Sequence, residues 1–101
     1  MLVVHGTFPI KPEATGDLRA AVGPLTEATR AEAGCVFYEW AESVETPGTF
    51  YSVEVWQARE NLDAHMTTEH VKAALAGLPD MLAGQPNLVG FDGGERIDLP
   101  I

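Results

Sequence analysis

The sequence predicts a single α+β domain over residues 1–101, with the ferredoxin-like order strand, helix, strand, strand, helix, strand. A length of 101 residues is typical of one domain. Hydrophobic residues make up 46% of the chain and charged residues 21%, an ordinary globular composition. Stretches rich in β-branched and aromatic residues alternate with stretches of helical periodicity in that order. A four-stranded antiparallel sheet with its helices on one face leaves the other face bare, and we expect a second copy to cover it.

The first strand and the first helix are predicted from periodicity and breakers. Residues 2–10 are rich in β-branched and aromatic side chains, which favour a strand. Apolar residues then recur at helical spacing, at Leu18, Val22, Leu25 and Ala28. Pro24 removes a backbone hydrogen bond inside this stretch, so we expect a kink there. Gly34 is predicted to lie just past the end of the helix.

A hairpin follows the first helix. Residues 35–40 and 50–56 have strand composition, and the segment 46–49 between them, Thr-Pro-Gly-Thr, is typical of a turn. Side chains of a strand alternate between its two faces. One face of the second hairpin strand is therefore predicted to carry Phe50, Ser52, Glu54 and Trp56.

Two helical segments and a strand are predicted in the second half of the chain. A short helix spans residues 59–65, and Thr67 or Thr68 caps a second helix that ends at Pro79. The buried side of that second helix is predicted to consist of Val71, Ala74, Leu75 and Leu78. Residues 87–91 form the fourth strand.

The C-terminal segment, residues 93–101, begins with two glycines that break the fourth strand. Residues 96–99 within it are predicted to form a short extra strand. We expect this segment to cross to a partner subunit.

The charge balance excludes several classes of partner. Fifteen acidic residues face six basic ones, for a net charge of −9, and the basic residues are scattered. Nucleic acids and anionic membranes require basic surfaces, so neither is expected as a partner. A polyphosphate substrate is equally disfavoured, because no glycine-rich loop or basic cluster is present. A neutral organic substrate fits best.

The compartment is predicted from cysteine usage and from the N-terminal residues. Cys35 is the single cysteine, so no intrachain disulfide can form, which suits a reducing compartment. The first residues lack the basic and apolar regions of a signal peptide, and no run of 18 apolar residues occurs. We therefore expect a cytoplasmic protein.

Metal binding and nucleophilic catalysis are not expected. The histidines are His5, His65 and His70. On one continuous helix, His65 and His70 would point about 140° apart, whereas a helix break between them would bring them together. The pattern marks no third ligand. Cys35 lies in an apolar run, where a single cysteine is usually a small buried hydrophobe.

The residues between 54 and 70 are the densest in chemical groups. Glu54, Trp56 and His65 would line one pocket between sheet and helices if Glu54 faces inward. His70 and Tyr38 are further candidates for the pocket. Each has an alternative: Trp56 and Tyr38 as core residues, Glu54 as a solvent-exposed carboxylate, and both histidines as structural groups.

Two motifs resemble those of the antibiotic biosynthesis monooxygenase family, and in particular its small quinol monooxygenases. The first is E-x-W, followed after eight residues by His and after four more by a second His, which matches Glu54, Trp56, His65 and His70. The second is E-x-G-C-x-x-Y, which matches Glu32, Gly34, Cys35 and Tyr38. With the predicted element order around them, the matches cover residues 2–92.

The resemblance implies a homodimeric α+β barrel that oxygenates a small phenolic or hydroquinone compound with O2 and uses no cofactor or metal. It implies His65 as general base with Glu54 as its orienting partner, and substrate contacts from Trp56, Tyr38, His70 and His5. Proton transfer from a phenol to an imidazole costs about 5 kcal/mol at their ordinary pKa values. A turnover near once per second corresponds to a barrier of about 17 kcal/mol, so the free energy of this transfer lies well below the barrier.

Two other functions remain open from the sequence. The same histidine would serve an isomerase or a lyase that does not use O2. A dimeric barrel of this kind would also serve as a non-catalytic carrier of an apolar metabolite. The family includes heme-degrading oxygenases and a phosphosugar isomerase, so membership does not fix the activity.

Overall fold

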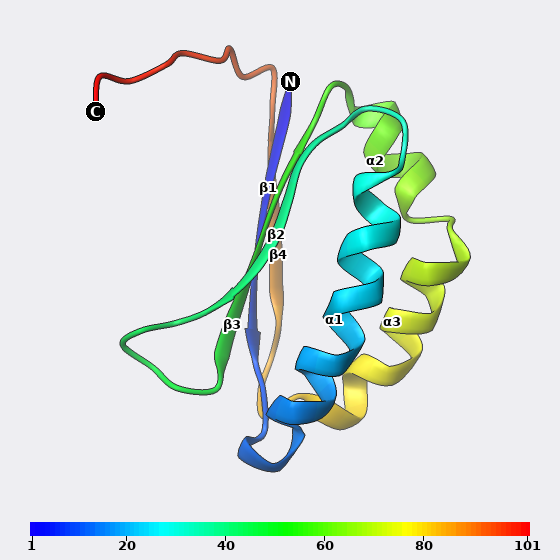
Figure 1. Cartoon of the computed structure of the whole chain (residues 1–101), viewed down its shortest axis with the longest axis vertical. Helices are drawn as coiled ribbons and strands as arrows, with labels where there is room; N and C mark the ends of the chain where they lie inside the picture. The colour runs from blue at the N-terminus through cyan, green and yellow to red at the C-terminus, as the bar shows by residue number, and fades with distance from the viewer.

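The computed structural model describes residues 1–101 and contains a four-stranded antiparallel sheet with its helices packed on one face (Figure 1). The strands, whose order across the sheet is β2-β3-β1-β4, are β1 (Leu2–Pro9), β2 (Cys35–Glu42), β3 (Thr49–Trp56) and β4 (Asn87–Asp92). The helices are a short 3₁₀ turn (Pro12–Ala14), α1 (Thr15–Arg30), α2 (Arg59–His65) and α3 (Glu69–Met81). The ferredoxin-like α+β prediction is therefore confirmed.

The alternation of side chains determines which sheet face meets the helices. On β1, the alternate residues Leu2, Val4, Gly6 and Phe8 are buried, while Val3, His5 and Thr7 between them are exposed or half-buried. On β3, Phe50, Ser52, Glu54 and Trp56 are all buried, which confirms the face predicted for this strand. We call this buried side of the sheet the inner face and the side without helices the open face.

Each of the two long helices contains a proline. Helix α1 continues through Pro24, and α3 continues through Pro79 to Met81, so the prediction that α3 ends at Pro79 is wrong. A proline removes one backbone N–H donor from a helix. Pro79 lies in the last turn of α3, and its carbonyl accepts a hydrogen bond from Leu82 N at 3.4 Å. Leu75 is also not buried as predicted: it is 49% exposed.

The C-terminal segment 93–101 forms no strand in this chain, so the extra strand predicted at 96–99 is not present. The segment follows β4 at Gly93, which adopts a positive φ of 87°. From there it extends away from the sheet on the side of the open face (Figure 1). No neighbouring strand of this chain lies alongside it to supply hydrogen bonds, which is why the strand does not form.

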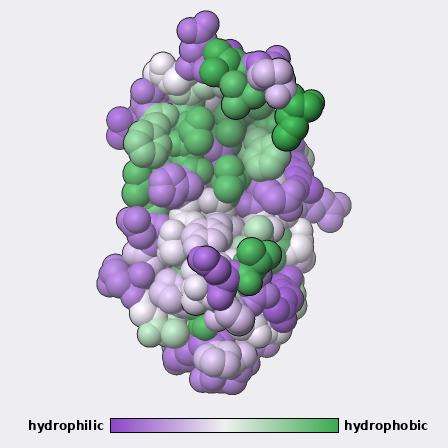
Figure 2. Space-filling model, turned by 90° about the vertical axis from the view of Figure 1, so that its left-hand side faces the viewer, coloured by the Kyte–Doolittle hydropathy of each residue, from purple (hydrophilic) through white to green (hydrophobic).

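The open face carries a cluster of apolar side chains. Figure 2 shows them gathered on the half of this face that lies nearer the chain termini. Phe37, Val53 and Phe91 are 48%, 41% and 60% exposed there. His5 lies on the same face and stacks on Phe91 with ring centroids 5.9 Å apart. None of the helices is both long and apolar enough to span a membrane.

Candidate active site

A cavity of about 90 Å³ lies between the inner face of the sheet and helices α1 and α3. Fourteen of its 17 lining residues are hydrophobic, and the other three are Ser52, Glu54 and His65. Met66 and Leu75, both substantially exposed, also line it, so it opens to the surface beside the α2–α3 junction. This volume is smaller than that of an apolar cavity of about 150 Å³ that holds benzene, so an aromatic ring placed here would extend into the open side of the cavity.

The cavity exists because the middle of the inner face carries small residues. The pairing register places Trp40, Ser52, Gly6 and Leu88 in one row across the four strands. Gly6 and Ser52 form the centre of this row, between larger side chains. A Cβ atom on Gly6 would lie 2.5 Å from both Phe8 and Ser52 Oγ. Because glycine has no side chain, the sheet surface beneath the cavity is not raised at this position.

Glu54 and Trp56 form a buried pair at one end of the cavity. Trp56 is 0% exposed and Glu54 5% exposed, and Trp56 Nε1 donates to Glu54 Oε1 over 3.0 Å. Burial raises the pKa of the Glu54 carboxyl, and the hydrogen bond from Trp56 partly opposes this shift. The shift means that Glu54 keeps its proton to a higher pH than a solvent-exposed carboxyl does.

Replacing Glu54 with glutamine is expected to stabilise the protein in a pH-dependent way. The raised pKa means that ionising Glu54 costs folding free energy, so wild-type stability falls as the pH rises from the ordinary value of 4.5 through the raised one. Glutamine keeps an oxygen for Trp56 Nε1 and does not ionise. The advantage of Glu54→Gln should grow between pH 4 and pH 8, by about 1.4 kcal/mol for each unit of raised pKa. Urea unfolding across this range measures it, and a constant difference would contradict it.

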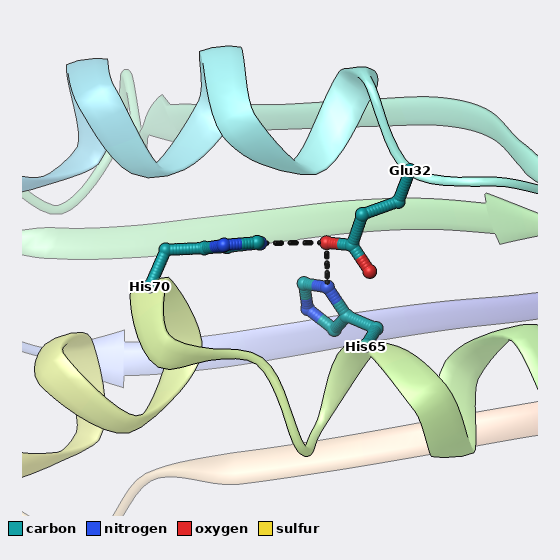
Figure 3. Close-up of side chains that lie close together, drawn as sticks. All are labelled: Glu32, His65 and His70. Atoms are coloured by element: carbon teal, nitrogen blue, oxygen red, sulfur yellow. Dashed lines mark hydrogen bonds and ion pairs between the residues drawn. The ribbon is translucent and has the colours of Figure 1, made fainter.

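His65 and His70 meet because the helix breaks between them. Helix α2 ends at His65, and Thr68 caps α3 by accepting from Val71 N at 3.4 Å while its hydroxyl donates to the carbonyl of His65 at 2.7 Å. The change of direction brings both imidazoles to Glu32, whose Oε2 lies 2.7 Å from His65 Nδ1 and 2.7 Å from His70 Nε2 (Figure 3).

Glu32 is held by the turn that joins α1 to β2. Asn61 of α2 fixes this turn, because its Nδ2 donates to the carbonyl of Ala33 over 3.2 Å. Gly34, with φ of 78°, lies against Asn61 so closely that a Cβ atom would overlap its amide. The prediction that Gly34 lies just past the end of the helix is wrong, because α1 ends at Arg30 with Ala31 as its cap; Gly34 belongs to the turn that carries Glu32.

The contact with Glu32 defines how His65 can act. A carboxylate accepts hydrogen bonds, so the neutral imidazole donates its Nδ1–H to Glu32 and its lone pair is on Nε2. Figure 3 shows this second nitrogen on the side of the ring away from Glu32. The ring is 3% exposed, lines the cavity, and lies between Trp56 and Tyr38 with centroid distances of 4.9 and 5.8 Å. No hydrogen bond joins it to Glu54.

Tyr38 lines the cavity as a wall. Its hydroxyl accepts from Trp40 Nε1 at 3.0 Å, and burial raises the pKa of Tyr38 to about 12. The phenol therefore stays protonated at neutral pH. Burial likewise raises the pKa of the Cys35 thiol, which makes it a poor nucleophile.

The family model for antibiotic biosynthesis monooxygenases matches residues 1–77, which include all the polar residues of this site. The chain belongs to the antibiotic biosynthesis monooxygenase family. The resemblance in the two sequence motifs is thus confirmed at the level of the family.

Relatives of this monooxygenase family share both sequence and fold with the chain. The protein sll1783 of Synechocystis is 32% identical over 82 residues, which cover 81% of this chain and 56% of that protein. The chain thus spans little more than half the length of that relative. YcnE of Bacillus subtilis, whose name proposes a monooxygenase, is 26% identical over 88% of this chain and 94% of its own. A Deinococcus radiodurans structure, named as a proposed antibiotic biosynthesis monooxygenase, has a TM-score of 0.91 at 27% identity and covers 99% of both chains.

The residues predicted for the site in this family member separate into three groups. His65, Glu54 and Tyr38 line the cavity. Trp56 lies in the core with Leu2 and Val4 and supports the cavity wall from below. His70 contacts Glu32 but not the cavity, and His5 lies on the open face, away from the other candidates.

Glu32 is the residue that sequence reasoning missed as a site residue, although it begins the second family motif. The expectation that no third ligand accompanies the two histidines is wrong, because donor atoms of Glu32, His65 and His70 lie within 4.8 Å of one another. One carboxylate and two imidazoles can hold a divalent metal ion. The carboxylate oxygen is 2.7 Å from each nitrogen, however, and ligand atoms around one metal stand about 3.0–3.4 Å apart. The arrangement is that of hydrogen bonds.

Proposed function

We propose that the protein is a cofactor-independent monooxygenase that oxidises a hydroquinone or a related phenol with O2. The observation that carries this proposal is His65: Glu32 holds one of its ring nitrogens, and the ring borders an apolar cavity that opens to the surface. A base fixed in one tautomer beside such a cavity is suited to deprotonating a ring hydroxyl. Membership of the monooxygenase family supports the same reaction.

Deprotonation is the step for which the protein is needed. His65 Nε2 takes the hydroxyl proton, and the electron-rich ring anion then gives one electron to O2. The two radicals combine at a ring carbon, and loss of water from the resulting peroxide leaves a hydroxyquinone. Hydroquinone plus O2 gives hydroxyquinone plus water, so the substrate supplies all four electrons and no other reductant is required.

Glu54 and the apolar walls complete the proposed site. The water that leaves carries away a proton, and Glu54, whose pKa is raised by burial, is placed to supply it. His65 and Glu54 thus divide the roles of base and acid. Tyr38 and the other apolar walls hold the ring flat and exclude water from the anion.

Oxygen uptake tests this function. The protein, treated with a chelator, is given a panel of hydroquinones and polycyclic phenols, with spontaneous oxidation at the same pH as the background. Saturable uptake above that background, with one O2 consumed per substrate, supports the proposal. Turnover without O2 consumption would indicate an isomerase or a lyase, and no turnover of any compound would indicate a binding protein.

We also propose that the protein is a homodimer formed through the open faces of two sheets. The apolar cluster shown in Figure 2 is a surface of the kind that interfaces cover. The segment 93–101 lies on the same side and exposes Ile97, Leu99 and Ile101 almost fully. A partner subunit would bury all three.

Removing residues 93–101 is expected to weaken the dimer at least tenfold. Burying an apolar side chain is worth about 1.5–3 kcal/mol, and a tenfold change in dissociation constant corresponds to about 1.4 kcal/mol. Light scattering over a dilution series measures the shift. The full-length double variant Ile97→Ser, Leu99→Ser is the matched control for chain length. Unchanged dissociation of both variants would contradict the crossing of this segment.

A further inference from the structure

Ser52 is a buried polar side chain without a partner. It is 1% exposed, and its Oγ makes no hydrogen bond in the structure. A buried hydroxyl that loses its water and gains no partner destabilises the folded state, so nearly all such groups are paired in native proteins. Glu54, its neighbour on the same strand face, accepts from Trp56. Ser52 is therefore the exception on the inner face.

The position of Ser52 connects this unpaired hydroxyl to the cavity. Ser52 is one of the three residues in the cavity lining that are not hydrophobic. Its partner across the strands is Gly6, where any side chain would press on Ser52 Oγ and Leu88. The glycine thus makes room for the hydroxyl itself, which lies over Gly6 beside Phe8 and Leu88, and rotation about the single Cα–Cβ bond of serine is enough to aim it at a ligand.

The other polar groups of the cavity lie at a fixed separation from Ser52. Glu54 follows two residues later on the same face, so the two side chains are about 6.6 Å apart along β3. His65 is at the Glu54 end, because its ring packs on Trp56. Two oxygens at opposite positions of one aromatic ring have a comparable separation. The walls between the two ends are apolar.

We propose that Ser52 is a specificity-determining residue, whose hydroxyl hydrogen-bonds the ligand oxygen opposite the one that His65 deprotonates. The cavity then selects a ring with oxygens in a 1,4 relation over a ring with a single hydroxyl. This inference rests on the proposed function, since it uses the same cavity and the same base. It adds the second anchor that fixes the direction of the ring.

Binding without O2 tests this role separately from turnover. Calorimetric titration under nitrogen with 1,4-dihydroxybenzene and with phenol compares a two-ended and a one-ended ligand of the same ring. Wild-type protein is expected to bind the two-ended ligand about five- to tenfold more tightly. Ser52→Ala should remove this preference and leave phenol binding unchanged. Ser43→Ala, the same substitution in the β2–β3 loop, should leave the binding of both ligands unchanged.

A stability measurement distinguishes this role from a structural one. If Ser52 serves only a ligand, removing its unpaired hydroxyl should raise the Tm of the ligand-free protein, by about 4 °C. The proposal is overturned if wild-type protein binds both ligands equally, or if Ser52→Ala weakens both to the same degree. If oxygen uptake is absent but the preference for two oxygens depends on Ser52, the monooxygenase proposal fails and the Ser52 proposal stands.

Discussion

Replacing His65 with alanine is expected to lower the rate constant of oxygen consumption by about 10²- to 10⁴-fold, the range over which general bases act. The base is lost, and no other imidazole lines the cavity. Burial raises the pKa of the Tyr38 phenol to about 12 and also raises the pKa of the Glu54 carboxyl, which disfavours the ionised form of each. Binding of the substrate should change much less, because the remaining walls are intact. Initial rates of oxygen uptake at saturating hydroquinone measure the effect.

The control for this variant lies two residues away on the same helix. Asp63 of α2 is exposed and makes no hydrogen bond, so Asp63→Ala should leave the rate unchanged. The rate of Glu32→Gln should lie between the rates of His65→Ala and Asp63→Ala. An amide in place of the carboxylate orients the imidazole less strictly, while the base itself remains. Oxygen uptake by His65→Ala at the wild-type rate would eliminate the assignment of His65 as base.

Replacing Trp56 with alanine is expected to lower the free energy of unfolding by about 3–5 kcal/mol. Trp56 is 0% exposed and packs against Leu2, Val4 and Leu62, so its removal leaves a large cavity under β1 and β3. It also takes from Glu54 the donor that the buried carboxyl uses. Urea unfolding followed by circular dichroism measures the loss.

Trp56→Phe separates packing from hydrogen bonding. The phenyl ring keeps most of the apolar contact but has no Nε1–H, so a loss of about 1–3 kcal/mol is expected from the unpaired carboxyl, together with a small packing loss. Val44→Ala in the exposed β2–β3 loop should change stability by less than about 0.5 kcal/mol. If Trp56→Ala cost no more than this control, Trp56 would not be a principal core residue.

Local sequence patterns predicted most of the fold and part of the site. The alternation on β3 placed Ser52, Glu54 and Trp56 on the inner face, and the predicted helix 59–65 matches α2. These features depend on neighbours a few residues apart, which a pattern contains. The break after His65 was also predicted, because Thr67 or Thr68 was expected to cap a second helix, and Thr68 does so.

The features that the sequence did not predict arise from distant parts of the chain. Glu32 meets His65 across 33 residues, and no local period marks such a contact. Leu75 was expected in the core because of its helical spacing, yet it lines the cavity and is half exposed. His5 alternates onto the open face because β1 begins its buried pattern at Leu2.

The contact of Glu32 with two histidines closes a long stretch of chain. Between Glu32 and His65 lie the whole β2–β3 hairpin and α2, so the imidazole finds its carboxylate only when the helices have docked on the sheet. In the unfolded chain, bringing the two ends of such a loop together costs conformational entropy. No contact between residues closer in the sequence replaces this one. Catalytic activity should therefore report on tertiary structure: during refolding it should return with docking, later than the helical signal of α1 and α3.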